Sequence, residues 1–322
     1  MDKKVKQFVS APLPFQWQKR RHVKEFSNLI KTIRPDLVVD LFGGSGLLSY
    51  CAKRANPQSC VIYNDYDNYC ERLARIEQTN ELLRYFRKLL KDKGIQPEAK
   101  IPETLQKIIL QKLADENYVD WITLSVSLLF SMRYATNYAE FERNAFYNKI
   151  SLFDYSADGY LDGLEVVSTD YSELIKKYKD VPGTLFLADP PYLSTDVKTY
   201  TLVQDWTMKN YLDILTALSG LNYVYFTSDK SQIVELCQWI DDNKNKVANI
   251  FKGAIISTVK SPTSGRNSYT DIMLYNLKWN YCNSKFLCTF ANLFLICDVW
   301  NIIMIIIRET MSGKLPKNVQ RD

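Results

Sequence analysis

Short apolar runs alternate with amphipathic stretches along most of this chain, and this alternation predicts strands separated by helices. A helix is expected at residues 24–33, a second after residue 46 and others at 208–218 and 231–240. The expected strands lie at residues 37–41, 59–65, 166–171, 186–188 and 222–229. Strands that alternate with helices indicate a mainly parallel sheet with helices on its faces.

The end of this region predicts an antiparallel hairpin. Residues 254–259 and 270–277 have the pattern of strands, and the turn-forming residues 261–265 join them. We therefore expect an α/β fold in which a mainly parallel sheet ends in an antiparallel pair. Functional side chains should gather at the carboxyl ends of the parallel strands.

Residues 71–159 depart from this alternation and predict a mostly helical insert. Apolar residues recur at helical spacing from Leu73 to Leu89, and an unbroken apolar run follows at 121–132. Aromatic and basic residues then interleave from Arg133 to Lys149. That composition suits a surface where cations meet phosphates and Tyr or Asn reaches base edges. The alternative is an amphipathic helix with aromatic residues in its core.

The last part of the chain, residues 281–322, does not fit the pattern. Residues 286–307 are apolar over a length that could span a bilayer, but Asp298 lies within the run. On insertion scales an Asp costs about 2.5 to 3.5 kcal/mol, against about 0.3 to 0.6 gained for each Leu, Ile, Phe or Val. A packing helix or partner-binding segment is therefore favoured over an anchor. The expected parts are a catalytic domain at 1–70 and 160–280, the insert at 71–159 and the extension at 281–322.

Composition narrows the chemistry. The chain has 322 residues and a net charge of +5, which indicates nucleic-acid binding only weakly because clustered cations, not the total, give affinity. Its seven cysteines lack Cys-x-x-Cys spacing, so a reducing cytoplasm is expected and neither zinc nor disulfides are. The single histidine, His22, argues against Ser-His or Cys-His catalytic pairs. The charged first residues do not resemble a secretion signal.

A glycine-rich loop follows the strand at 37–41, with the sequence Asp-Leu-Phe-Gly-Gly-Ser-Gly at 40–46. Glycines allow close approach of the backbone to a ligand. The spacing is not that of a dinucleotide site, and Asp40 would repel a pyrophosphate but could pair with the ammonium of an adenosyl amino acid. Asp65 ends the next strand, where an acid is placed to accept hydrogen bonds from ribose hydroxyls. A turn or helix-capping role is the alternative for Asp65.

A second acidic loop, Asp189-Pro190-Pro191-Tyr192, follows the strand at 186–188. A conjugated exocyclic amine is a poor nucleophile, because its lone pair is delocalised, and it needs acceptors that favour a pyramidal nitrogen. The Asp189 carboxylate and the Pro190 carbonyl supply two such acceptors, and the prolines remove competing backbone donors. The ring of Tyr192 offers a face on which an extruded base can stack. An ordinary strand-end turn is the alternative.

Together these segments resemble the Dam-like adenine-N6-specific DNA methyltransferases, over most of residues 8–278. The resemblance implies a Rossmann-like methyltransferase sheet with a helical target-recognition insert. It also implies S-adenosylmethionine as cofactor, double-stranded DNA as partner, no metal, and methyl transfer to an adenine flipped out of the duplex. In a restriction-modification role a cognate restriction nuclease would be a further partner.

The resemblance also assigns residues to the cofactor. In the N-terminal arm Phe15 and Lys19 match the family, whereas Trp17 stands where the family usually has glycine. Asp170 matches an acid that accepts a hydrogen bond from the cofactor's adenine, with a helix N-cap as the alternative role. The expected cofactor contacts are Phe15, Lys19, Asp40, Phe42, Gly43, Gly44, Gly46, Asp65 and Asp170.

DNA contacts are expected from the insert, because target recognition in the family lies between the two loops. The expected residues are Arg133, Tyr134, Asn137, Tyr138, Arg143 and Lys149. Two alternatives stay open: an RNA adenine methyltransferase, and a relative that binds cofactor or DNA without turnover, which Trp17 and the apolar extension suggest.

Overall fold

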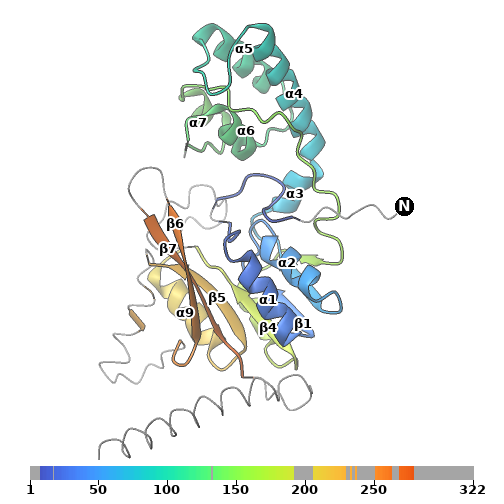
Figure 1. The fold of residues 1–322 in the computed structure, drawn as a ribbon, viewed down its shortest axis with the longest axis vertical. Coiled ribbons are helices and arrows are strands. Elements are labelled where there is room, and N and C mark those ends of the chain that lie inside the picture. The colour runs from blue at the N-terminus through green and yellow to red at the C-terminus, as the bar shows by residue number, and fades with distance from the viewer. Residues whose placement is uncertain are drawn as a thin grey trace, which may run out of the picture. The chain divides into compact units, whose positions relative to one another are not determined.

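The structure is a computed structural model that describes residues 8–16, 18–131, 133–191, 206–229, 233, 236–237, 251–262 and 268–278. Its centre is a seven-stranded sheet in the order β3-β2-β1-β4-β5-β7-β6 (Figure 1). The strands are β1 Leu37–Asp40, β2 Cys60–Asn64, β3 Glu165–Val167, β4 Thr184–Ala188, β5 Tyr223–Ser228, β6 Ile255–Pro262 and β7 Ser268–Asn276. β1 to β5 pair in parallel, and β7 runs antiparallel to both β5 and β6. The predicted mainly parallel sheet with an antiparallel hairpin is confirmed.

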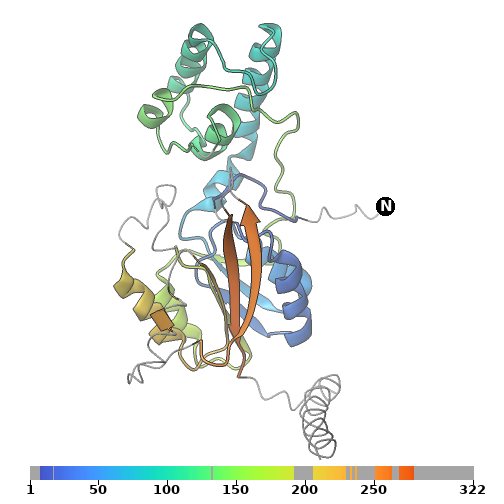
Figure 2. The ribbon, with the colours of Figure 1, turned by 60° about the vertical axis from the view of Figure 1, so that its left-hand side comes forward.

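Helices cover both faces of this sheet. α1 contacts α2, and α8 contacts α9. Figure 2 shows α1 on one side of the β6–β7 hairpin and α9 on the other. The bounds are α1 Val23–Ile33, α2 Leu47–Ala55, α8 Tyr171–Tyr178 and α9 Met208–Leu218. Val39, Phe186 and Tyr225 of the strands pack with Leu215 of α9 in one buried cluster, which explains why the central strands are mostly apolar.

A second buried cluster holds the helices between β2 and β3 together. Leu82, Phe86, Leu124 and Phe146 are among its members. Leu82 and Phe86 belong to the helical spacing that predicted helix at the start of this region. Figure 1 shows α4 to α7 grouped around this core. The bounds are α3 Tyr69–Ala74, α4 Ile76–Asp92, α5 Glu103–Ala114, α6 Trp121–Leu128 and α7 Tyr138–Glu142.

The order in which the chain adds strands to the sheet reverses at β1. The chain passes from β1 to β2 and β3 on one side, then returns to place β4 and β5 on the other. Asp40 lies opposite Leu187, so the loops after β1 and β4 leave the sheet at the same edge. In open α/β sheets this is the position where ligands bind.

Some expectations fall outside the described residues. These are the extension at 281–322, most of the helix expected at 231–240, Trp17 and Tyr192. Within the part of the chain that the structure describes, no helix is long and apolar enough to cross a membrane.

Candidate active site

A cavity of about 270 Å³ lies among the loops that follow the parallel strands. The loop after β1 lines it with Phe42, Gly43 and Gly44, and the loop after β4 lines it with Asp189 and Pro191. The two motifs singled out in the sequence, far apart along the chain, therefore lie on the wall of the same cavity. The N-terminal arm, residues 8–22, adds Phe15 and Lys19.

The glycine-rich loop needs its glycines for two different reasons. Gly44 and Gly46 have φ of +49° and +73°, a region that disfavours side chains. Gly43 instead has no room, because a Cβ atom there would lie 2.3 Å from the ring of Tyr63. Tyr63 in turn donates a hydrogen bond to the Gly44 carbonyl over 2.8 Å. The loop is thus held against β2 with its backbone toward the cavity.

Asp40 lies behind this loop and not on the cavity wall. Its side chain is fully buried, and Oδ2 accepts a 2.7 Å hydrogen bond from Ser49 Oγ of α2. Oδ1 has no hydrogen-bond partner among the described residues. Burial raises the pKa of this carboxyl to about 7. Asp40 is not among the residues that line the cavity, and the expected pairing with a ligand ammonium stays a prediction.

Asp65, the expected ribose acceptor, is engaged elsewhere. Its carboxylate accepts hydrogen bonds from the backbone of Tyr69 at 2.6 Å and of Cys70 at 2.9 Å, and so holds the start of α3. Asp65 does not line the cavity, whereas Asp67, two residues later, does. Asp67 Oδ1 is buried without a partner in the described structure, and burial together with the charge of Asp65 raises its pKa to about 6.

Aromatic rings close the side of the cavity near α8. The ring of Phe42 lies 5.2 Å from that of Tyr171 and 5.5 Å from that of Trp206. Asp170 also lines the cavity, and its carboxylate accepts a 2.8 Å hydrogen bond from Ser172 N as the N-cap of α8. The capping role is therefore observed for Asp170, and the adenine contact stays a prediction.

Sequence reasoning missed Asp67, Tyr171, Trp206 and Asn210, all on the cavity wall. For Asp67 a signal was present, since it is a second acid in the turn after β2. Trp206 and Asn210 stand at the start of α9, which no sequence motif connects to the glycine loop.

The N-terminal arm is anchored to α2 and α3. Phe8 N donates to Tyr50 Oη over 3.1 Å, and Leu13 exchanges two hydrogen bonds with Tyr69 Oη. The ring of Phe15 packs edge-on against that of Tyr69 in α3, with centroids 5.6 Å apart. The arm thereby carries Lys19 into the cavity.

Lys19 forms an ion pair with Asp189. Lys19 Nζ lies 2.6 Å from Asp189 Oδ2, and the two side chains are 5% and 19% exposed. Burial raises the pKa of Asp189 above its ordinary value, and the positive charge of Lys19 opposes this rise. Pro190 and Pro191 are buried beside it. The sequence led us to expect Lys19 on the cofactor, and the structure places its ammonium on the acidic loop.

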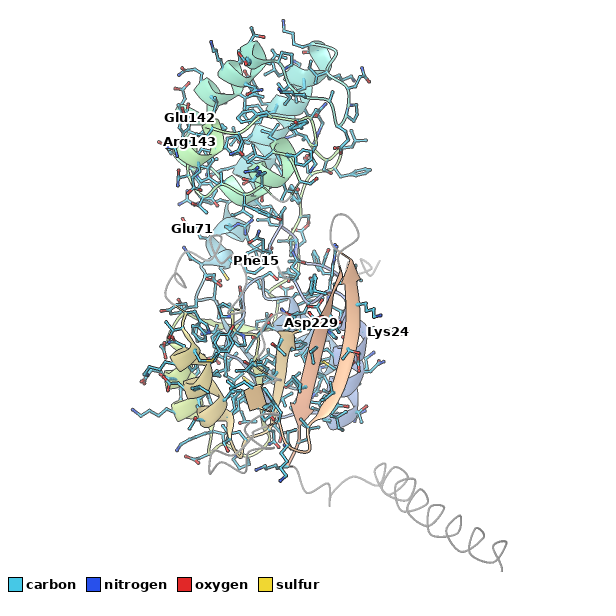
Figure 3. The ribbon with its side chains drawn as sticks, turned by 90° about the vertical axis from the view of Figure 1, so that its left-hand side faces the viewer. Phe15, Lys24, Glu71, Glu142, Arg143 and Asp229 are labelled. Carbon is cyan, nitrogen blue, oxygen red and sulfur yellow. The ribbon has the colours of Figure 1, made fainter. Side chains whose placement is uncertain are left out.

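The residues expected to contact DNA do not line the cavity that holds Asp189. Several of them instead form hydrogen bonds or ring contacts with nearby residues. Asn137 caps α7 by accepting from Glu140 N over 3.0 Å, and Tyr138 packs on Trp121 with ring centroids 6.1 Å apart. Arg143 is exposed at the end of α7 (Figure 3), and Arg133 is exposed as well. Tyr134 is half-buried and hydrogen-bonded to Gln16, and Lys149 Nζ donates to Ser131 Oγ over 3.1 Å.

A doubly wound sheet with a glycine-rich loop at its switch point is a Rossmann-like fold. The model of the D12 class N6 adenine-specific DNA methyltransferase family matches residues 18–261. A Haemophilus influenzae protein named "Putative methyltransferase" is 34% identical over 278 residues, which cover 84% of this chain and 93% of that protein. A solved methyltransferase from Geobacter sulfurreducens is 12% identical with a TM-score of 0.31 and 82% of each chain covered, a likeness too distant to carry an argument. The chain belongs to the D12 class N6 adenine-specific DNA methyltransferases.

Proposed function

We propose that this methyltransferase transfers a methyl group from S-adenosylmethionine to the N6 amine of an adenine that is held outside duplex DNA. The observation that supports this most is the shared cavity, because Asp189 and the glycine loop line the same wall. Family membership supports DNA adenine as the substrate. The cofactor and the extruded base are the parts that we propose.

The residues around the cavity fit an adenosyl amino acid. Gly43 and Gly44 leave the loop backbone open to a ligand. Asp40 lies behind this loop, off the cavity wall, so its role toward an ammonium is the weaker part of the proposal. Asp67 Oδ1 is an unpartnered acceptor in the described structure and suits a ribose hydroxyl. Phe42 and Tyr171 provide aromatic surface beside Asp170 for a planar base. When bound, the cofactor supplies an electrophilic methyl group on a positively charged sulfur.

The acidic loop orients the amine. In the proposal the Asp189 carboxylate and the Pro190 carbonyl accept hydrogen bonds from the two N–H groups of the amine. These hydrogen bonds draw the nitrogen lone pair out of conjugation and toward the methyl carbon. Tyr192 stacks on the ring. Orientation of this kind contributes much of a rate enhancement, because the reacting atoms are aligned before the reaction. The proton released from the methylated amine leaves to Asp189 or to water.

DNA is proposed to lie against the segment from Arg133 to Lys149. Arg133 and Arg143 are exposed and have no ion pair within the described structure, so both are suited to phosphates. Tyr138 and Asn137 have structural partners of their own and are weaker candidates for base contacts. The recognised DNA sequence is not predicted from these positions.

The function is tested by expressing the chain in cells that lack adenine methylation and sequencing their DNA with modified adenines identified at single-base resolution. We expect N6-methyladenine at one short sequence. A matched incubation of purified protein with duplex DNA, structured RNA and labelled cofactor separates the DNA from the RNA substrate. Cofactor binding without incorporation into either polymer would contradict the proposal and favour the non-catalytic alternative.

Asp65 and Asp67 provide a matched pair of variants for the cofactor site. We expect Asp67→Asn to weaken S-adenosylmethionine binding by about tenfold with little change in thermal stability, because a charged acceptor in the cavity is lost. Asp65→Asn should lower thermal stability instead, because it disturbs the hydrogen bonds to Tyr69 and Cys70. Calorimetric titration and thermal unfolding measure both. The opposite pattern would assign the ribose to Asp65.

A further inference from the structure

The ion pair between Lys19 and Asp189 joins the N-terminal arm to the acidic loop across the cavity wall. We propose that Lys19 is a positioning residue for Asp189. Lys19 fixes the orientation of the Asp189 carboxylate and keeps it in the charged form that accepts a hydrogen bond from the target amine. The inference rests on the proposed function, because it concerns the group that we place on the substrate. It departs from the cofactor contact expected of Lys19 from the sequence.

The first step of the argument is geometric. The contact of 2.6 Å uses Oδ2 of Asp189, and 19% of the Asp189 side chain stays exposed in the cavity. A carboxylate whose one oxygen is held by an ammonium has its second oxygen fixed in direction. That second oxygen is the acceptor available to a base in the cavity. Without Lys19 the carboxylate could rotate about its own bond.

The second step concerns how Lys19 is held. His22 N donates to the Lys19 carbonyl over 2.9 Å, and α1 begins at the next residue. Gln18 accepts from Ala11 N over 2.9 Å, and Arg21 donates to the Lys260 carbonyl of β6. Backbone and neighbouring side chains therefore fix the segment on both sides of Lys19. A cation presented from such a segment can orient a partner, whereas a mobile surface lysine cannot.

The third step is electrostatic. Among the described residues, Asp189 also interacts electrostatically with three other titratable groups, Asp271, Asp40 and Tyr225. Asp271 disfavours a negative charge at Asp189, as burial does, whereas Tyr225 stays a neutral phenol near neutral pH because burial raises its pKa. Lys19 is the cation that opposes Asp271 and burial. A neutral carboxyl would donate a hydrogen bond and lose one acceptor, so removing the charge of Lys19 should shift Asp189 toward its inactive form.

The test uses Lys19→Met, with Lys19→Arg as the matched variant that retains the charge. Infrared difference spectra of the cofactor-free protein, with Asp189→Asn to assign the band, follow the carboxyl as the pH is changed. In Lys19→Met the Asp189 pKa should rise further, so the ionised form appears only at higher pH. The acid limb of kcat on duplex DNA should move up by about one pH unit or more, which corresponds to about a fivefold loss or more at the old midpoint.

Lys19→Arg should restore both the titration and the pH profile to within about threefold of the wild type in kcat, because its pKa keeps it charged. An unchanged Asp189 titration in Lys19→Met with a raised KM for the cofactor would overturn the proposal and return Lys19 to the cofactor. If Lys19→Met does not fold, Lys19→Gln carries the same test. Failure of the proposed function would show as a wild type without methylation, while the infrared titration still reports on the pair.

Discussion

Asp189→Ala should reduce kcat for DNA methylation by about a hundredfold to a thousandfold, with S-adenosylmethionine affinity within a few fold of the wild type. The expected size is that found when a single preorganised polar group is removed from an active site. The carboxylate is proposed to act on the target amine and not on the cofactor, so binding and turnover should separate. Methyl incorporation at saturating cofactor and calorimetric titration measure the two effects.

Stability needs its own control in this experiment, because Asp189→Ala removes the acid with which the buried Lys19 forms an ion pair. Removing one member of a buried ion pair costs about 3 to 5 kcal/mol. The double variant Asp189→Ala with Lys19→Met removes both charges and should recover much of that stability. It should stay inactive. A double variant that is both stable and active would show that neither residue takes part in methyl transfer.

The fold was predictable from the sequence because the central strands are mostly apolar. β1 and β4 lie between helical layers, so every position of both is buried, and apart from Asp40 and Thr184 their residues are apolar. The hairpin was predictable from its turn residues, but β6 extends to Pro262, beyond the expected end at 259. Strand ends depend on pairing with β7, which sequence patterns do not contain.

The site was predictable only where a motif fixes its own geometry. Gly43 and Gly44 lie on the cavity wall as expected, because the loop leaves a strand end whose position the fold determines. The choice between Asp65 and Asp67 was not predictable. The choice depends on which carboxylate accepts hydrogen bonds from the backbone N–H groups at the start of α3. In this structure that carboxylate is Asp65.

In the insert, too, the composition of the sequence did not determine which contacts its residues make. Aromatic residues from Tyr138 to Phe146 fitted both a DNA surface and a helical core. Phe141 and Phe146 are buried with Leu128, which supports the core interpretation for these two positions. Arg133 and Arg143 are exposed, and a role on DNA stays a prediction for them. The spacing and composition of a sequence do not distinguish an aromatic side chain that packs in the core from one that contacts a base.

Gly43→Ala should destabilise the protein and impair cofactor binding together. The added Cβ would lie 2.3 Å from the ring of Tyr63 and 2.7 Å from the Asn64 carbonyl oxygen. Tyr63 cannot easily turn away, because it is fully buried and its hydroxyl is bonded to Gly44 O and Asp65 Oδ1. We expect a cost of about 3 kcal/mol, the upper part of the usual range for overpacking, and a displaced loop that binds cofactor at least tenfold more weakly.

Gly94→Ala is the matched control for this substitution. Gly94 has a φ of +68° and nothing within 4 Å of an added Cβ, so only the backbone strain, about 1 to 2 kcal/mol, should appear. Thermal unfolding and calorimetric titration of S-adenosylmethionine compare the two variants. Gly43→Ala should be the less stable of the two, and cofactor affinity should fall only there. Equal stability and unchanged affinity in both would mean that the loop after β1 yields to the methyl group and does not shape the cavity as its contacts indicate.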